Sequence, residues 1–272
     1  MILAQNAFIS PILKRFNMQN DRDVSTPMDP NVKLDLAQDP GENKLKDIKR
    51  YQAIVGSLMY AALATWPDIS FAVAALCRYN SCPFTSHLTT TNTVLHYLTS
   101  TADFRLHCST SSSTNSNDQL AGYTHHDWAN DSSDRKSQEG YVFLLINGAL
   151  SWQLRKQDLI AMLTLDAEYI AYSEGSREAQ WLLLLHPDIH GENTSPLTIT
   201  CDNHDALTHI ITGIINARTT HIDVGYHNCR DFRACKIVDY FYAHTNMILA
   251  DILTKAFSKD THEKFPKAMG IW

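Results

Sequence analysis

The sequence predicts an α/β fold with a mixed sheet, preceded by a small helical unit. Residues 51–100 hold three runs of apolar side chains at helical spacing. Residues 119–154 hold three short β-type runs separated by turn signals, and helical and strand-like segments alternate after them. A hairpin sheet that is extended by strands alternating with helices is typical of a domain with both antiparallel and parallel strands.

Bulk composition limits the classes of protein to consider. The 272 residues are 44% hydrophobic and 19% charged, enough for a core in one large or two modest domains. No apolar run reaches the roughly 20 residues that cross a bilayer, and the N-terminus lacks the apolar stretch of a signal peptide. The six dispersed cysteines include no C-x-x-C pair, so we expect a reduced, intracellular protein, cytoplasmic or nuclear, with no membrane partner.

The net charge of −6 argues against a stand-alone, tight nucleic-acid binder. Neutralisation of phosphates by basic side chains supplies most of the affinity of such proteins. The chain therefore either does not bind nucleic acid tightly or depends on a partner to do so.

The first half of the chain divides into a connector and three helices. Residues 20–50 are rich in Asp, Asn, Pro and Lys and predict an extended, partly ordered connector. "YQAIVGSLMYAALAT" predicts a helix, "WPDISFAVAALCRYNS" a second, and "TSHLTTTNTVLHYLTST" a third. Pro67 suits the first turn of the second helix, where Asp68 complements the positive end of the helix dipole.

The second half begins after a Ser/Asn-rich linker at 108–118. "QLAGYT", "GYVFLLI" and "ALSWQL" predict three strands, with "NGA" at 147–149 as a hairpin turn. "MLTLDAEYIAYSEGSREAQWLLLLH" predicts a long helix, and "LTITC" a strand that ends at Asp202. "RTTHIDVGYHNCRDFRA" predicts helix, "KIVDYFYAH" a strand, and "MILADILTKAF" a final helix.

Four single carboxylates fall at the ends of these elements: Asp127, Glu168, Asp202 and Asp251. A topology of this kind can gather strand ends and helix starts at one rim of the sheet. Carboxylates without cysteine partners favour Mg²⁺ or Mn²⁺ over zinc. Two such ions about 4 Å apart would clamp the attacking and leaving oxygens of a phosphodiester. The alternative is that these acids are solvated surface or capping groups.

A zinc site is disfavoured. The candidate ligands are His221, His227, Cys229 and Cys235, or Cys201 with His204, and their spacings match no standard finger pattern. Cys201 lies in an apolar strand and is expected in the core.

Several strings occur in the order of a known family. They are "YQAIVGSLMYAALATWPDISFAVAALCRYNS", "GYTHHDWANDSSDRKSQEGYVFLLINGALSWQLRKQ", "DAEYIAYSEGSREAQWL", "CDNHDAL", "ARTTHIDVGYH" and "LADILTKAF". From about Ile2 to Phe257 the chain resembles the C-terminal part of copia-type LTR-retrotransposon polyproteins. That part comprises the tail of the reverse transcriptase, a connection segment and a ribonuclease H (RNase H) domain.

The resemblance implies a division of the chain. It implies a reverse transcriptase remnant and linker at 1–50, a helical connection segment at 51–107, the linker at 108–118, an RNase H-like domain at 116–258 and a tail at 259–272. The domain is expected to be a mixed five-stranded sheet with flanking helices. The first 50 residues are expected to be poorly ordered without the polymerase. No Tyr-x-Asp-Asp motif is present, so no DNA synthesis is expected.

The implied activity is cleavage of the RNA strand of RNA–DNA hybrids, with two Mg²⁺ or Mn²⁺ ions held by four carboxylates. The family's first acid stands in a Tyr-Ser-Asp-Ala-Asp-Trp string, which here reads "YTHHDW", so that His125 replaces it. The other three positions match Glu168, Asp202 and Asp251, the predicted catalytic and metal-binding residues.

The change at His125 predicts that cleavage is weakened or lost. A neutral imidazole offers one nitrogen and no charge, and it suits zinc or copper better than magnesium. Asp127 points to the same face of the strand and is the candidate substitute. Two strand residues span about 6.6 Å, however, so this substitution needs a shift of the backbone.

The expected nucleic-acid contacts are basic residues. Compared with the family, Trp66 stands where Arg is usual and Thr220 where Lys is usual. The remaining candidates for contacts to the nucleic-acid backbone are Arg135, Lys136, Arg155, Lys156 and Arg218. Scattered solvated charge is the alternative interpretation.

The expected partners are an RNA–DNA hybrid and the reverse transcriptase portion of the parent polyprotein. Two other hypotheses remain open. One is an active nuclease in which Asp127 takes over from His125. The other is a non-enzymatic remnant, domesticated or vestigial, that binds nucleic acid or a protein.

Overall fold

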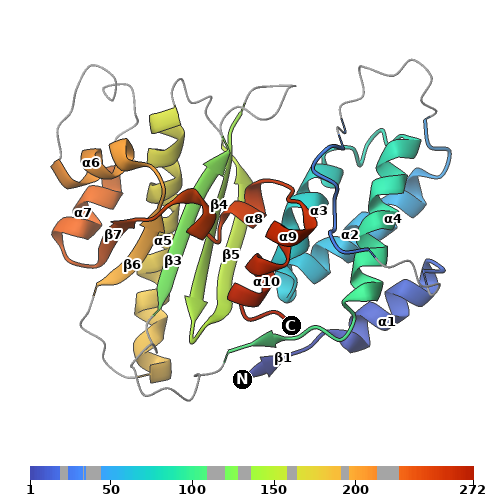
Figure 1. Cartoon of the computed structure of the whole chain (residues 1–272), viewed down its shortest axis with the longest axis horizontal. Coiled ribbons are helices and arrows are strands. Elements are labelled where there is room, and N and C mark those ends of the chain that lie inside the picture. The colour runs from blue at the N-terminus through green and yellow to red at the C-terminus, as the bar shows by residue number, and fades with distance from the viewer. Residues whose placement is uncertain are drawn as a thin grey trace. The chain divides into compact units, whose positions relative to one another are not determined.

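The computed structural model describes residues 1–18, 24–32, 34, 44–108, 120–127, 136–157, 164–190, 196–212 and 227–272. The chain forms two compact units, one of Met1–Ser109 with Lys255–Trp272 and one of Thr110–Thr254. We call them unit 1 and unit 2 (Figure 1). No helix in the described part of the chain combines the length and the apolarity needed to cross a bilayer.

Unit 1 is mainly helical. Its elements are β1 Ile2–Leu3, α1 Asn6–Arg15, α2 Ile48–Ala64, η2 Pro67–Ile69, α3 Ser70–Cys77, α4 Thr85–Ser100, β2 Leu106–His107, α9 Lys259–His262 and α10 Lys264–Ala268. The apolar faces of α1 to α4 form its core. Helices α2, α3 and α4 confirm the three helices predicted between 51 and 101.

Three features of unit 1 go beyond the sequence prediction. Helix α1 packs Ile9 and Ile12 into the core. Asp68 is 1% exposed and accepts a hydrogen bond from Tyr97 at 2.5 Å, so it is a buried core group in addition to a helix-start residue. Helices α9 and α10 occupy the predicted tail.

Unit 2 is built on a five-stranded sheet. Its elements are β3 Ala121–Asp127, β4 Gln138–Leu145, β5 Gly148–Lys156, α5 Thr164–His190, β6 Leu197–Cys201, α6 His204–Thr212, α7 Asn228–Ala234, β7 Val238–Tyr242, η4 Thr245–Met247 and α8 Asp251–Thr254. The strand order is β5-β4-β3-β6-β7 (Figure 1). Strands β3, β4 and β5 are antiparallel, whereas β6 runs parallel to both β3 and β7. The predicted mixed α/β sheet with flanking helices is confirmed.

Helix α5 packs closely on the central strand. A Cβ atom built on Gly175 of α5 would lie 2.5 Å from the Thr124 side chain of β3. The absence of a side chain at Gly175 therefore allows this close approach. The close contact between Gly175 and Thr124 fixes α5 above β3. It thereby positions the start of the helix near the end of that strand.

Two predicted elements differ from the structure. The hairpin loop consists of Ile146 and Asn147, both with positive φ, one residue before the predicted turn. The final helix predicted at 247–257 is only Asp251–Thr254. Residues 248–253 are almost wholly buried, so their apolar run reflects burial on all sides and not helical periodicity. The linker beyond Cys108 and residues 213–226 lie outside the described residues.

Candidate metal and nucleic-acid site

The candidate site lies where the central strand β3 runs past its parallel neighbour. The pairing of β3 with β6 ends at Tyr123 and Thr200. Strand β6 stops at Cys201, so the next residues of the two chains, around His125 and Asp202, face one another without ladder bonds. Their side chains are thus brought together at the carboxyl ends of two parallel strands, where ligand sites are common.

His125 contacts two carboxylates. Its Nε2 lies 3.0 Å from Oδ1 of Asp251, the first residue of α8, and its Nδ1 lies 3.5 Å from Oδ1 of Asp202. The three side chains are at most 10% exposed. The imidazole therefore bridges two of the carboxylates that the sequence predicted as metal ligands.

The charge of His125 follows from these neighbours. Burial alone would lower the pKa of the imidazole, but the carboxylates of Asp202 and Asp251 outweigh burial and raise the pKa to about 9. The pKa of Asp202 is lowered. Burial opposes this, and His125 and Thr245 together outweigh it by hydrogen bonding. At neutral pH His125 is thus an imidazolium between two acids.

Glu168 approaches from the other side of the sheet. Neighbouring residues of a strand point to opposite faces, so His126 faces α5 where His125 does not. His126 Nδ1 lies 3.0 Å from Glu168 Oε1. Gln157 donates to the carbonyl of Ala167 at 2.8 Å and to Glu139 at 3.0 Å, which holds the start of α5 in place.

The predicted site residues are not all brought together. Ligand atoms of His125, Glu168 and Asp202 lie within 4.8 Å of one another. Asp127 ends β3, half-buried, and is not a member of that group, so its role as a substitute acid stays a prediction. The contact of His126 with Glu168 and the effect of Thr245 on Asp202 were not predicted from the sequence. The alternation of strand faces could have signalled the first, but nothing in the sequence signalled the second.

The donor set can be tested against a divalent ion. Glu168, Asp202 and Asp251 offer oxygens, the atoms that Mg²⁺ and Mn²⁺ prefer. Oε2 of Glu168 is buried and receives no hydrogen bond, which is costly unless a cation or a donor satisfies it. Glu168 and Asp202 fit a hard cation together, because their ligand oxygens lie within 4.8 Å of one another, whereas Asp251 is placed beside them only by its contact with His125. An imidazolium at His125 does not fit, because it presents N–H groups and a positive charge.

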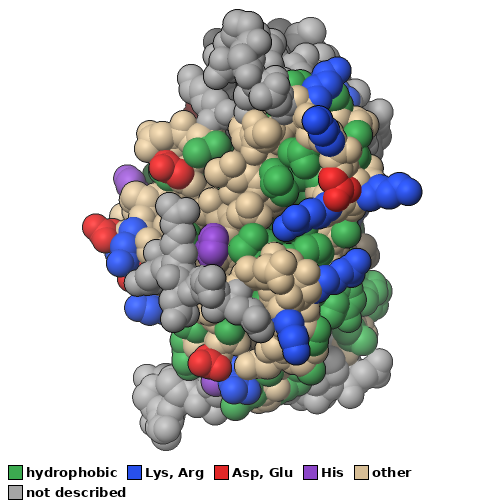
Figure 2. All heavy atoms as spheres, turned by 90° about the vertical axis from the view of Figure 1, so that its right-hand side faces the viewer, with side chains coloured by type: hydrophobic (Ala, Val, Ile, Leu, Met, Phe, Trp, Pro, Cys, Tyr) green, Lys and Arg blue, Asp and Glu red, His purple; other side chains and the backbone are tan. Residues whose placement is uncertain are grey.

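Of the predicted nucleic-acid contacts, Lys136, Arg155 and Lys156 are described, and they lie at the end of the sheet where β3 ends. Lys156 pairs with Gln138, which in turn pairs with Asp127 at the end of β3. Arg155 pairs with Glu139, and Lys136 precedes β4. Arg135 and Arg218 lie outside the described residues. On the described part of the face drawn in Figure 2, Lys and Arg side chains are scattered among hydrophobic and acidic ones.

A mixed sheet of this order, with carboxylates around the end of its central strand, defines an RNase H-like domain. No family model matches the chain. The chain is 35% identical over 272 residues to the retrovirus-related Pol polyprotein from transposon TNT 1-94 of Nicotiana tabacum, covering 99% of this chain and 20% of that protein. It is 32% identical over 269 residues to the corresponding polyprotein from transposon RE1 of Arabidopsis thaliana, covering 99% of this chain and 18% of that protein.

Among solved structures, LC11-RNase H1 in complex with an RNA/DNA hybrid aligns with a TM-score of 0.37 and 12% identity, over 50% of this chain and 93% of that one. Over nearly its whole length the chain is similar to a part of the retrovirus-related Pol polyproteins of plant transposons, as the sequence motifs predicted. It spans about a fifth of the length of the curated relatives that it matches.

Proposed function

We propose that unit 2 binds RNA–DNA hybrids as part of a transposon polyprotein and cleaves their RNA strand much more weakly than a four-carboxylate site would. The observation that supports this is the contact of His125 with Asp202 and Asp251, at 3.5 and 3.0 Å. The imidazolium brings N–H groups close to both acids and adds positive charge where a cation would bind. Its presence therefore competes with the binding of a divalent ion.

Glu168, Asp202 and Asp251 are the proposed ligands of Mg²⁺ or Mn²⁺. Such an ion, when bound, polarises a phosphoryl oxygen and lowers the pKa of a coordinated water. The chain's own residues prepare this position. Helix α5 presents the buried Glu168 oxygen that lacks a donor, and His125 and Thr245 favour the ionised form of Asp202. Asp127 is the proposed source of a further carboxylate if the end of β3 shifts.

The proposed nucleic-acid contacts are Lys136, Arg155 and Lys156, at the same sheet end as the acidic cluster, with Arg135 and Arg218. The net charge of −6 supports weak hybrid binding by the chain alone, and the reverse transcriptase portion of the polyprotein is the partner proposed to strengthen it. An intracellular location, cytoplasmic or nuclear, is supported by the six cysteines, none of which forms a disulfide.

Separate measurements of binding and cleavage test this proposal. The full chain and Asp202→Asn are incubated with a labelled RNA–DNA hybrid in Mg²⁺ or Mn²⁺, and binding is followed by anisotropy in EDTA. We expect hybrid binding by both, slow cleavage by the wild type and none by Asp202→Asn. Absence of hybrid binding, or cleavage that survives in Asp202→Asn, would contradict the proposal.

A second candidate function is a non-enzymatic, nucleic-acid- or protein-binding remnant. The same imidazolium favours it, because its positive charge already offsets part of the negative charge of Asp202 and Asp251, so the cluster has less need of a metal ion. It predicts hybrid binding without any cleavage, even when His125 is restored to Asp.

A further inference from the structure

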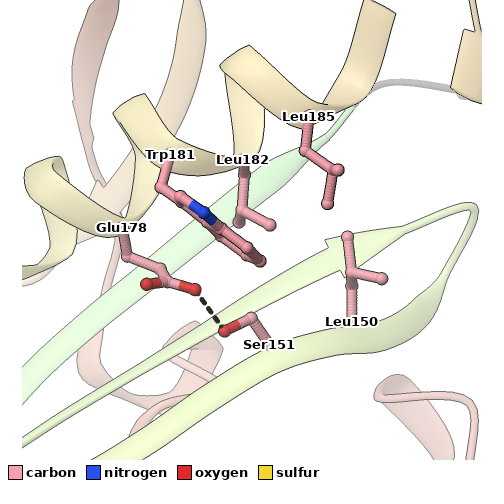
Figure 3. A pocket seen from close by; sticks show the side chains of 6 residues that line it. All are labelled: Leu150, Ser151, Glu178, Trp181, Leu182 and Leu185. Carbon is pink, nitrogen blue, oxygen red and sulfur yellow. Dashed lines mark hydrogen bonds between the residues drawn. The ribbon is translucent and has the colours of Figure 1, made fainter. Parts of the chain in front are cut away.

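Unit 2 has an open groove away from the acidic cluster. It lies between β5 and the C-terminal half of α5 and has a volume of about 510 Å³ (Figure 3). The lining residues are Leu150, Ser151, Glu178, Trp181, Leu182 and Leu185. None of them belongs to the candidate metal site.

A β-bulge shapes the strand side of the groove. Ala149 pairs with Leu144 and Ser151 pairs with Phe143, so Leu150 is an extra residue in β5. A bulge changes the direction of side chains along a strand. Figure 3 shows Leu150 and Ser151 both directed toward α5, although successive strand residues ordinarily point to opposite faces. The bulge thus supplies an apolar and a polar side chain to one side of the groove.

The helix side exposes a cluster of large apolar side chains. Trp181 is 55% exposed, Leu184 73% and Leu185 38%, although all three belong to one stretch of α5. The indole of Trp181 lies across the groove between Glu178 and the leucines (Figure 3). Exposed apolar side chains gathered in this way mark surfaces that bind partners.

One end of the groove is acidic. Glu178 lies one helical turn before Trp181, and its Oε1 accepts a hydrogen bond from the Ser151 hydroxyl at 2.6 Å. Burial and the nearby Glu178 carboxylate raise the pKa of the Tyr141 hydroxyl. Among the described residues, no Lys or Arg forms an ion pair with Glu178. The carboxylate is held in place beside an indole face without a basic partner from the described chain.

We propose that this groove docks a polypeptide segment that presents an arginine or lysine beside a bulky apolar residue. The charge is complementary to Glu178, and the face of a tryptophan attracts a cation. The aliphatic stem and the apolar neighbour would cover Leu182, Leu185 and Leu150. Among the described strands β5 pairs only with β4, so its outer edge can add an extended segment next to the groove.

A matched pair of peptides tests the proposal on the full chain. The probe is a fluorescein-labelled Gly-Leu-Arg-Leu-Gly peptide, and its control carries citrulline, which keeps the shape of arginine but not its charge. Anisotropy is measured with the wild type, Trp181→Ala and Glu178→Gln. Ile211→Ala, a 48% exposed residue on α6, is the control for loss of an exposed apolar side chain.

We expect the arginine peptide to bind the wild type with a Kd of about 100 µM. We expect Trp181→Ala to weaken it by about tenfold or more. Glu178→Gln should weaken the arginine peptide and leave the citrulline peptide unchanged, whereas Ile211→Ala should change neither. Leu185→Lys, which adds a positive charge to the groove, should also weaken the arginine peptide.

Three results would overturn the proposal. One is a lack of saturable binding up to about 1 mM peptide. Another is equal binding by the wild type, Trp181→Ala and Leu185→Lys, all shown to be folded by circular dichroism. The third is a wild-type dimer in sedimentation analysis that Trp181→Ala dissociates, because the occupant of the groove would then be a second copy of the chain.

Discussion

Replacement of His125 by aspartate is expected to destabilise unit 2 when no divalent ion is present. The substitution removes the cation that lies 3.0 Å from Asp251 and 3.5 Å from Asp202. It also adds a carboxylate beside them and near Glu168. Four acids would then share one site in which the described side chains are at most 10% exposed.

The size of the effect follows from this burial. Removal of one partner from a buried ion pair costs about 3–5 kcal/mol. For a unit of this size, 1 kcal/mol shifts the melting temperature by about 3 °C, so we expect a decrease of roughly 10 °C in EDTA. An ion bound at 100 times its Kd restores about 2.7 kcal/mol. Most of the loss should therefore be recovered in excess Mg²⁺.

Thermal unfolding of the full chain in EDTA and in Mg²⁺ measures this. The wild type should gain little from Mg²⁺ and His125→Asp should gain most of its lost stability. The matched control is His204→Asp, the same change at an exposed position at the start of α6, which should behave as the wild type. The reasoning is refuted if His125→Asp is as stable as the wild type in EDTA, or if Mg²⁺ stabilises both proteins equally.

Three further predictions concern stability. The pKa of His125 is about 9 in the folded chain and about 6.5 in the unfolded chain, so protonated His125 stabilises the metal-free chain, fully so below pH 6.5. In denaturant titrations the free energy of unfolding should fall by about 3 kcal/mol by pH 9–10, and by much less in His125→Asn. Burial lowers the pKa of His262, so unit 1 should lose stability as pH falls below 6.5, and His262→Gln should reduce that loss in acid melts. Gly175→Ala, which crowds Thr124, should cost about 1–3 kcal/mol in urea unfolding, whereas Gly56→Ala, with no atom within 4 Å, should not destabilise.

The sequence predicted the regular elements where their periodicity was local. Helix α4 shows this, since the prediction over 85–101 agrees with Thr85–Ser100. Three antiparallel strands and a mixed sheet also followed from the alternation of strand and helix patterns, whereas the order β5-β4-β3-β6-β7 within the sheet was not predicted. The predicted final helix over 247–257 was too long, because residues 248–253 are almost wholly buried, Asp251 included, and show no exposed face from which a helical period could be read.

The candidate site was predictable in part. Glu168, Asp202 and Asp251 were named from motif positions, and the structure brings them to the end of β3. The charge on His125 was not predicted: the sequence reasoning treated it as a neutral imidazole. Its protonation depends on distances to two carboxylates from separate elements, which only the tertiary structure supplies. The pairing of His126 with Glu168 likewise required the placement of α5 over β3.

The most direct test of the central claim is cleavage of a labelled RNA–DNA hybrid in Mg²⁺ and Mn²⁺ by the wild type, His125→Asp and the double variant His125→Asp, Asp202→Asn. If the imidazolium of His125 is what limits the site, His125→Asp will cleave the RNA strand far faster than the wild type, and the added Asp202→Asn change will abolish the gain. A wild type that cleaves as fast as His125→Asp would contradict the account.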